Sequence, residues 1–280
     1  MDWVKSLNKA LEYIEENITG DIDYEKIAKI CYCSQYNFQR MFSYMANVTL
    51  SEYIRRRKMS LAVIDLQMGN KILDVALKYG YNSPTSFNRA FKSIHGIAPS
   101  KVKEDGVIIK SYPPLSFQII IKGVEEMNYK IEQKKEMRIL GVSVPLEKDM
   151  EKNMMKIPSI WTKCMEDGTI DKLVNIMNED TKALLGVNVC NEEDNWRYFI
   201  AVASSIENEE FEEYIIPEAT WAIFEGEGTG ISIQNLMQKV FTEWLPNSGY
   251  EYANLPDLEV YYDPNPQNTK YEVWLPIVKK

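Results

Sequence analysis

Residues 83–95 read SPTSFNRAFKSIH, and this stretch predicts a helix with a marked start, an apolar face and a polar face. Ser83 suits the N-cap, and Pro84 suits the first helical position because its missing N–H would be unpaired there in any case. Phe87, Phe91 and Ile94 recur at helical spacing and should form the buried stripe. The remaining polar residues point away from the core and stay available for a partner; these are Thr85, Ser86, Arg89 and Lys92.

A second, shorter helix is predicted just before this one. Ile72, Val75, Ala76 and Tyr79 repeat at helical spacing, and Gly80 then supplies the permissive backbone that a tight turn needs. The two helices and the turn form a helix-turn-helix unit. Many helical proteins contain such a pair, so this pattern alone is weak evidence for DNA binding.

The pattern occurs twice in the chain. Four pairs of equivalent residues are each 49 residues apart: Ser34 and Ser83, Phe38 and Phe87, Arg40 and Arg89, Phe42 and Phe91. Between the two units, residues 51–67 (SEYIRRRKMSLAVIDLQ) predict one connecting helix of roughly 25 Å. A connector of that length can hold two recognition helices about one turn of DNA, ~34 Å, apart.

Residues 1 to about 103 resemble the DNA-binding domain of the AraC/XylS transcription regulators. The strings that carry the resemblance are IAKICYCSQYNFQRMF, SEYIRRRKMSLA and ILDVALKYGYNSPTSFNRAFKSIHGIAPSKVK. The resemblance implies an all-α double helix-turn-helix domain that binds double-stranded DNA. It also implies that the second helix of each unit reads the major groove. The predicted DNA-binding residues are Ser34, Tyr36, Gln39, Arg40, Ser83, Thr85, Ser86, Arg89 and Lys92.

The charge distribution supports two domains, predicted at residues 1–106 and 107–280. The whole chain of 280 residues carries a net charge of −9, which would repel a polyanion. Residues 1–103 hold 15 Lys and Arg against 10 Asp and Glu, whereas residues 104–280 hold 17 against 31. The first part is therefore a modestly basic module and the second an acidic one. The basic run at residues 55–58 suits either phosphate contact or a solvated helix face.

Composition argues against several kinds of site. The chain has four cysteines without a C-x-x-C pair, and they are expected to be buried thiols in a reducing compartment. His95 is the single histidine and is expected to end its helix as a cation. We therefore expect no metal, no cofactor and no histidine-based catalysis. The chain lacks an 18-residue apolar run and its start is acidic, so we expect a cytoplasmic protein with no membrane partner.

The second half predicts an α+β domain built from a duplicated β-α-β-β unit. The predicted strands and helices follow in two rounds: one strand or two in 129–144, helices at 157–166 and 171–177, strands at 184–190 and 197–203, then a strand at 213–225, a helix at 231–245, and strands at 258–262 and 271–277. The β-rich run Phe117 to Ile121 suits either a linker strand or, as we favour, a strand of this second domain.

The second half resembles the GyrI-like effector-binding domain, through the strings IPEATWAIFEGEG, LPDLEVYYDP and YEVWLPI. The resemblance implies a small-molecule effector, frequently a lipophilic cation, bound in a groove between the two repeats. After an AraC-type domain, it implies a Rob-type regulator of the multidrug-sensing kind. RNA polymerase is a candidate partner of such a regulator.

Aromatic residues and one carboxylate are the candidate effector-binding residues: Trp161, Tyr198, Trp221, Tyr262, Glu272 and Trp274. Strand alternation in residues 271–277 puts Glu272 and Trp274 on one face of the sheet. Two other interpretations remain open. The second domain could be a GyrI-like hydrolase that uses Glu272 with Tyr198 or Tyr262, or a protein-interaction module without a ligand. We expect no enzyme activity.

Overall fold

The computed structural model describes residues 3–118, 126–178, 182–190, 195–262 and 268–280. By its internal contacts the chain divides into two compact units. The helical unit comprises Asp2–Cys31 and Val48–Gln118, and the sheet unit comprises Tyr32–Asn47 and Ile119–Lys280. The helix that carries Arg40 therefore groups with the second half of the chain.

The helical unit consists of α1 Trp3–Glu16, α2 Tyr24–Ile30, α4 Leu50–Gln67, α5 Ile72–Lys78, α6 Pro84–His95 and a 3-10 turn at Pro99–Lys101. Ser83 caps α6 by accepting a hydrogen bond from the Ser86 amide, and Gly96 ends the helix at φ 78°. Phe87, Phe91 and Ile94 are buried in one cluster with residues of α4 and α5. The predicted helix-turn-helix and its connecting helix are thereby confirmed.

The segment 107–118 follows these helices and is fastened to the helical unit. The Asn8 side chain pairs with the backbone of Phe117 through two hydrogen bonds, each of 2.9 Å. Phe117 and Gln118 are not in a strand, and the rest of the strand predicted up to Ile121 lies outside the described residues.

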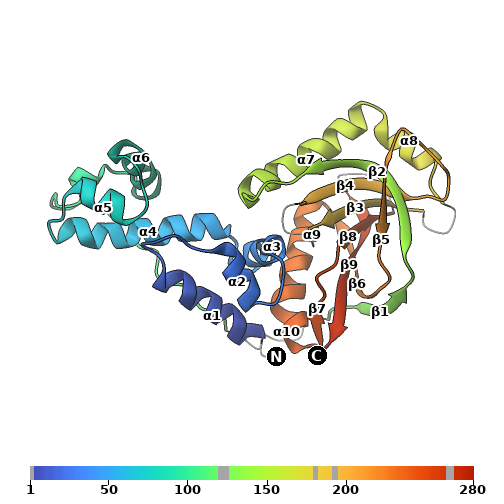
Figure 1. Ribbon diagram of the computed structural model, residues 1–280, viewed down its shortest axis with the longest axis horizontal. Helices are drawn as coiled ribbons and strands as arrows, with labels where there is room; N and C mark the ends of the chain where they lie inside the picture. The colour runs from blue at the N-terminus through green and yellow to red at the C-terminus, as the bar shows by residue number, and fades with distance from the viewer. Residues whose placement is uncertain (1–2, 119–125, 179–181, 191–194, 263–267) are drawn as a thin grey trace. The chain divides into compact units, whose positions relative to one another are not determined.

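Within its described residues, the sheet unit is built on nine antiparallel strands with helices against them (Figure 1). Its strands are β1 Tyr129–Lys134, β2 Met137–Pro145, β3 Leu184–Val189, β4 Arg197–Ala203, β5 Glu212–Ile216, β6 Ala219–Gly228, β7 Tyr250–Tyr252, β8 Asp257–Tyr261 and β9 Thr269–Lys279. Its helices are α3 Gln35–Ala46, α7 Met150–Glu166, α8 Thr169–Asn175, α9 Gly230–Lys239, a π turn at Val240–Trp244 and α10 Leu245–Asn247. The strand order β6-β9-β8-β3-β4-β2 is symmetric about its centre, which confirms the predicted duplication.

Two predicted elements of the sheet unit differ in extent. The strand predicted at 213–225 is two strands, because Pro217 lies between β5 and β6 and cannot donate to a ladder. The stretch 129–144 forms two strands, which is one of the two forms predicted for it. Helix α7 begins at Met150, earlier than predicted, because Asp149 caps it and Pro158 is accommodated inside it.

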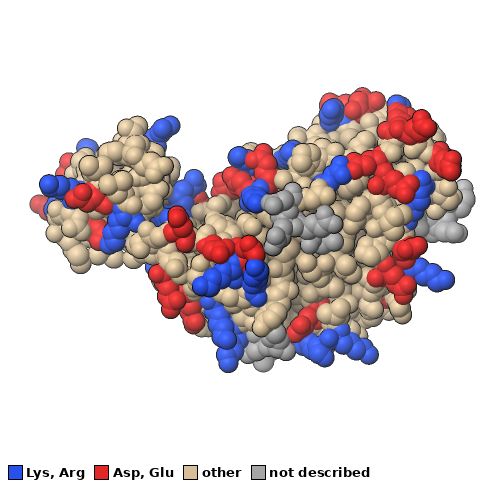
Figure 2. Space-filling view, viewed as in Figure 1, with Lys and Arg blue, Asp and Glu red and all other residues tan. Residues whose placement is uncertain are grey.

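The two faces of the sheet carry different residues. The helix face bears Tyr198, Ile200 and Glu259, and its apolar residues pack with α7 and α8 in one cluster. The opposite face bears Trp221, Val260 and Trp274 in a separate cluster. Figure 2 shows acidic side chains gathered over the α7–α8 end of this unit.

Candidate effector site and DNA-binding helices

Helix α6 presents the polar face that the sequence predicts. Thr85, Arg89 and Lys92 are exposed, while Ser83 and Ser86 are half-buried. Ser86 is used locally, because its hydroxyl donates to the Ser83 carbonyl oxygen at 2.8 Å. An exposed guanidinium can bind a guanine edge through two parallel hydrogen bonds, and an exposed ammonium can neutralise a phosphate.

Helix α3 has the same sequence pattern but the opposite exposure. Ser34 caps it by accepting a hydrogen bond from the Asn37 amide at 3.2 Å. Tyr36 is 1% exposed, Gln39 2% and Arg40 8%. The predicted base-reading residues of this helix are therefore covered by other parts of the chain.

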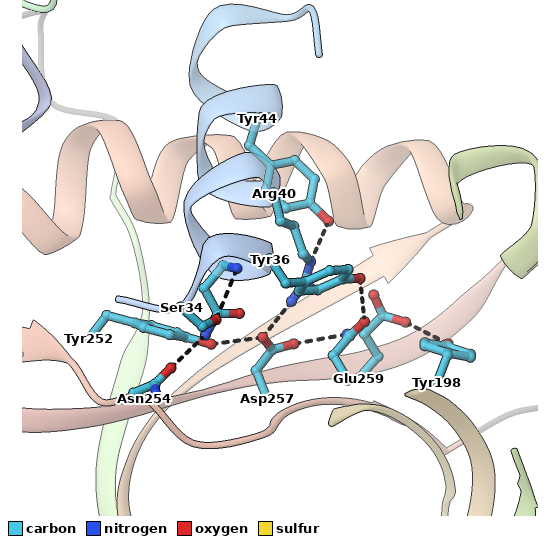
Figure 3. A network of polar contacts seen from close by, with 11 residues as sticks. Ser34, Tyr36, Arg40, Tyr44, Tyr198, Tyr252, Asn254, Asp257 and Glu259 are labelled. Atoms are coloured by element: carbon cyan, nitrogen blue, oxygen red, sulfur yellow. Dashed lines mark hydrogen bonds and ion pairs between the residues drawn. The ribbon is translucent and has the colours of Figure 1, made fainter. Parts of the chain in front are cut away.

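A buried ion pair holds Arg40 (Figure 3). Its guanidinium pairs with the Asp257 carboxylate on β8, on the helix face of the sheet. Asp257 also accepts hydrogen bonds from the Tyr252 hydroxyl at 2.9 Å and the Asn188 amide at 3.0 Å. Burial acts to lower the pKa of Arg40, but the Asp257 carboxylate together with the neighbouring Tyr44 and Tyr36 outweighs it and raises that pKa. Both side chains of the pair are almost completely removed from solvent.

Further contacts at the start of α3 surround this pair. The Tyr36 hydroxyl donates to the Asn188 side-chain oxygen at 3.1 Å, and its ring meets Trp196 edge to face at 5.2 Å. The Asn37 amide donates to the side-chain oxygen of Asn254 at 3.3 Å. These contacts fix the orientation of the helix around the ion pair.

The other end of α3 packs on α9 and the π turn that follows it. Tyr44 stacks on Phe241 with 6.1 Å between the ring centroids. The Gln238 amide donates to the Asn47 side chain at 3.2 Å. Helix α3 is thus held along its length.

Beside the ion pair, an aromatic cage surrounds the Glu259 carboxylate on β8. It accepts hydrogen bonds from the hydroxyls of Tyr198 at 3.1 Å and Tyr261 at 3.0 Å. Trp161 on α7 donates its ring N–H to Tyr198 at 2.9 Å and meets the Tyr261 ring at 5.2 Å. Burial raises the pKa of Glu259, and the charge of Arg40 opposes that rise. The residue is half-buried.

The other four predicted effector-binding residues lie elsewhere. Glu272 pairs with Lys130 at 3.0 Å and accepts hydrogen bonds from the Tyr262 hydroxyl at 2.8 Å and the Trp274 ring N–H at 2.7 Å. Trp221 packs against Trp274 with ring centroids 5.9 Å apart. Glu272, Trp274 and Trp221 share the face of the sheet opposite to Glu259. The structure therefore separates the pair Trp161 and Tyr198 from these four residues.

The opposite face also contains a small cavity. It has a volume of ≈ 160 Å³ and is lined by Lys134, Lys135, Met137, Ile216, Trp221 and Trp274. The Lys134 ammonium lies 5.2 Å from the centroid of a Trp274 ring. A protein cation thus already occupies the ring face that a cationic ligand would use.

Sequence reasoning missed Glu259 and its neighbours on β8. A signal was available, because residues 257–261 read DLEVY. Strand alternation puts Asp257, Glu259 and Tyr261 on one face and leaves Leu258 and Val260 on the other. Two carboxylates on the face that helices cover mark a polar site.

The cysteines and the single histidine lie mostly in buried positions. Cys31, Cys164 and Cys190 are buried and Cys33 is half-buried. His95 ends α6 as predicted, but it is 4% exposed and burial lowers its pKa, so the expected cation is disfavoured. Within the described parts of the chain, no group of three or more His, Cys, Asp and Glu could hold a metal ion. None of the described helices is long and apolar enough to cross a membrane.

The comparisons with known proteins match the two halves to two families. Residues 27–105 match a helix-turn-helix domain, and residues 130–277 match the integron-associated effector binding protein family. The transcriptional activator AarP of Providencia stuartii is 37% identical over 95 residues, which cover 34% of this chain and 70% of AarP. MarA of Salmonella typhimurium, the multiple antibiotic resistance protein, is 31% identical over 99 residues, covering 35% of this chain and 78% of MarA.

One relative spans both halves. YbfP of Bacillus subtilis, an uncharacterised transcriptional regulator of the helix-turn-helix type, is 22% identical over 247 residues, covering 74% of this chain and 81% of YbfP. Among solved structures, SAV2435 bound to tetraphenylphosphonium superposes with a TM-score of 0.49 at 20% identity, covering 54% of this chain and 94% of SAV2435. The chain belongs to the AraC-type helix-turn-helix transcription regulators that carry a GyrI-like, integron-associated effector-binding domain.

Proposed function

We propose that this regulator senses an aromatic, lipophilic cation and that Glu259 is the counter-ion of that effector. The observation that carries the proposal is the cage itself, a half-buried carboxylate surrounded by Tyr198, Tyr261 and Trp161. No basic side chain within the described residues forms an ion pair with Glu259, although Arg40 lies close enough to influence its charge.

The physical chemistry of the cage favours a cation. A carboxylate removed from water lacks part of its hydration, which is why its pKa is raised. An incoming organic cation restores a favourable charge environment and gains contact with ring faces. An anion would meet two carboxylates, Asp257 and Glu259, on the same face of one strand.

Calorimetric titration with two probes of similar shape tests the proposal. The probes are tetraphenylphosphonium, an aromatic cation, and triphenylphosphine oxide, a neutral analogue. Glu259→Gln keeps the shape of the side chain and should weaken binding of the cation by about 1–3 kcal/mol while leaving the neutral probe nearly unchanged. Glu272→Gln is the matched control on the opposite face and should change neither. A loss confined to Glu272→Gln would move the effector to the opposite face.

We propose that the cage binds its ligand without turnover. Burial raises the pKa of Tyr198 and Tyr261, and the neighbouring Glu259 charge adds to the rise, so both hydroxyls stay protonated as hydrogen-bond donors. Two relatives, AarP and YbfP, are transcription regulators by name. Recovery of an intact ester-bearing cation after prolonged incubation supports binding alone. Hydrolysis that Glu259→Gln abolishes would support the hydrolase alternative.

We propose that α6 and α3 each enter the major groove of double-stranded DNA. The exposed face of α6 supports this role directly for Thr85, Arg89 and Lys92. For α3 the support is the repeat, which puts Ser34, Tyr36, Gln39 and Arg40 at positions equivalent to those of α6. Footprinting on a bound duplex should show two protected major-groove segments about one turn apart.

We also propose that the protein works in the bacterial cytoplasm, where its DNA is, and that it contacts RNA polymerase. The similarity to a protein named as a transcriptional activator supports the second point. Co-purification with polymerase on promoter DNA tests the second point. The wild-type chain should co-purify with polymerase, whereas an Arg89→Ala variant should not.

A further inference from the structure

The two halves of an internal repeat differ sharply in exposure. Arg89 on α6 is exposed, whereas its equivalent on α3, Arg40, is 8% exposed and ion-paired to Asp257. Long charged side chains are almost never fully buried unless they are paired. The burial of Arg40 therefore depends on a specific partner in the sheet unit.

The surface that receives α3 is chemically matched to it. The helix offers the Arg40 guanidinium, which meets Asp257 (Figure 3). It also offers one phenol and one amide, which meet Asn188 and Asn254 respectively. The Asp257 carboxylate faces the helix, and hydrogen bonds from Tyr252 and Asn188 fix its orientation. Each polar contact of α3 thus has a counterpart of fitting chemistry.

One group in this interface is left without a partner. The side-chain nitrogen of Gln39 is buried and makes no hydrogen bond to any residue that the structure describes. An unpaired buried amide destabilises the docked arrangement, and water or a base edge would satisfy it once the helix is released. The docked state is therefore specific but incompletely satisfied.

We infer that the helix face of the sheet is a docking site for α3 itself, and that Arg40 bound to Asp257 withholds this helix from DNA until a cationic effector enters the cage at Glu259. The inference rests on the proposed function for the identity of the effector, but the docking stands on the contacts of Arg40 alone. Helix α3 acts as an internal ligand of the sensor domain.

The position of the cage explains how an effector can release the helix. Asp257 and Glu259 are alternate residues of β8 on the same face, so the Arg40 guanidinium lies within the electrostatic reach of both. A second positive charge at Glu259 would repel that guanidinium in a medium of low dielectric. Cation binding and α3 docking thus oppose each other.

This opposition fixes the sign of regulation. If only a fraction of molecules has α3 free, the apparent affinity for DNA is lowered by that fraction. A ligand that favours the free state must raise DNA affinity, and DNA must raise the affinity for that ligand by the same factor. The effector is therefore an activator of DNA binding.

Loss of the Asp257 charge is the first test. The DNA probe is a duplex of about 30 base pairs, three helical turns, selected from a random pool with the wild-type full-length chain. Removing one partner of a buried ion pair shifts an equilibrium by on the order of 100-fold. We therefore expect Asp257→Asn to tighten DNA binding about 10-fold or more without effector, up to the limit at which α3 is always free. Asp171→Asn removes the same charge from an exposed site on α8 and should leave affinity unchanged.

A reversible cross-link is the second test. Asn37 and Asn254 are hydrogen-bonded across the interface. Both are changed to Cys in a chain that also carries Cys33→Ser. A short cross-linker that a reductant cleaves then joins the two new thiols. We expect the joined protein to lose about 10-fold or more in DNA affinity, and reductant to restore it. Each single Cys variant should bind DNA normally.

The outcomes separate docking from effector chemistry. Unchanged DNA affinity in Asp257→Asn together with normal DNA binding by the cross-linked chain would overturn the inference, even if Glu259→Gln weakens cation binding. Tighter DNA binding by Asp257→Asn in a chain that does not bind tetraphenylphosphonium would support docking and refute the proposed effector instead.

Discussion

The raised pKa of Glu259 predicts that cation binding depends on pH. The ordinary pKa of this group is 4.5, and burial raises it in the effector-free protein. Below the raised value the cage is neutral and above it the cage carries a negative charge. Affinity for tetraphenylphosphonium should therefore rise with pH, by up to about tenfold per pH unit, and level off once Glu259 is ionised.

The size of the change follows from the surroundings of the carboxylate. Two unit charges about 5 Å apart attract by about 3 kcal/mol at an effective dielectric constant near 20. The neighbouring Arg40 cancels part of this attraction, and the Tyr198 and Tyr261 hydroxyls stabilise the ionised form. A net difference of about 1–3 kcal/mol between low and high pH is expected, which is the range for a charged hydrogen-bond partner.

Calorimetry at a series of pH values measures this difference. Titrations in two buffers with different ionisation enthalpies should also show proton release on binding, because the cation lowers the pKa of Glu259. Glu259→Gln should remove both the pH dependence and the proton release, whereas Glu272→Gln should keep them. A wild-type protein whose affinity stays flat from acid to neutral pH would refute the role of Glu259 as counter-ion.

Three further predictions concern DNA binding and stability. Arg89→Ala should cost about 1–3 kcal/mol on the selected duplex and much less on a scrambled one, whereas Lys92→Ala should weaken both equally in a fluorescence titration. Burial acts to raise the pKa of Glu15, but hydrogen bonds from Arg57 and Tyr53 outweigh it and lower that pKa. Its stabilising contribution is thus complete at neutral pH and lost as pH falls through the lowered pKa. Glu15→Gln should cost about 1–2 kcal/mol in urea denaturation at pH 7 and less in acid. Phe91→Ala should cost about 3–5 kcal/mol of unfolding free energy in the same assay, because Phe91 is 0% exposed in the helical core.

The helices of the first half could be predicted because their signals are local. Ser83, Pro84 and Gly96 mark the ends of α6 by their own backbone preferences, and the spacing of Phe87 and Phe91 fixes its buried face. The duplicated β-α-β-β unit was also predictable from alternation within single strands. Such features depend on residues within a few positions of one another.

The polar site was less predictable because its partners are distant in the sequence. Arg40 and Asp257 are 217 residues apart, and neither is marked by its immediate neighbours as one of a pair. Glu272 has the aromatic neighbours expected of a ligand counter-ion, but its ion-pair partner Lys130 lies 142 residues away. Strand alternation shows which side chains share a face of the sheet. It does not show which of the two faces the helices cover.

The guanidinium of Arg40 suits both DNA and the sheet unit as a partner. Its sequence pattern indicates only DNA. A guanidinium binds a carboxylate in much the same planar geometry as it binds a phosphate or a guanine edge. Two carboxylates, Asp257 and Glu259, face α3 from one strand, so the sheet offers this helix the kind of negatively charged oxygen that we propose α6 meets on DNA. The guanidinium that we propose to read DNA thus already has the chemistry that docking requires. A change at Arg40 would alter both interactions at once, whereas a change at Asp257 alters docking alone, so Asp257 is the position at which the two roles can be separated.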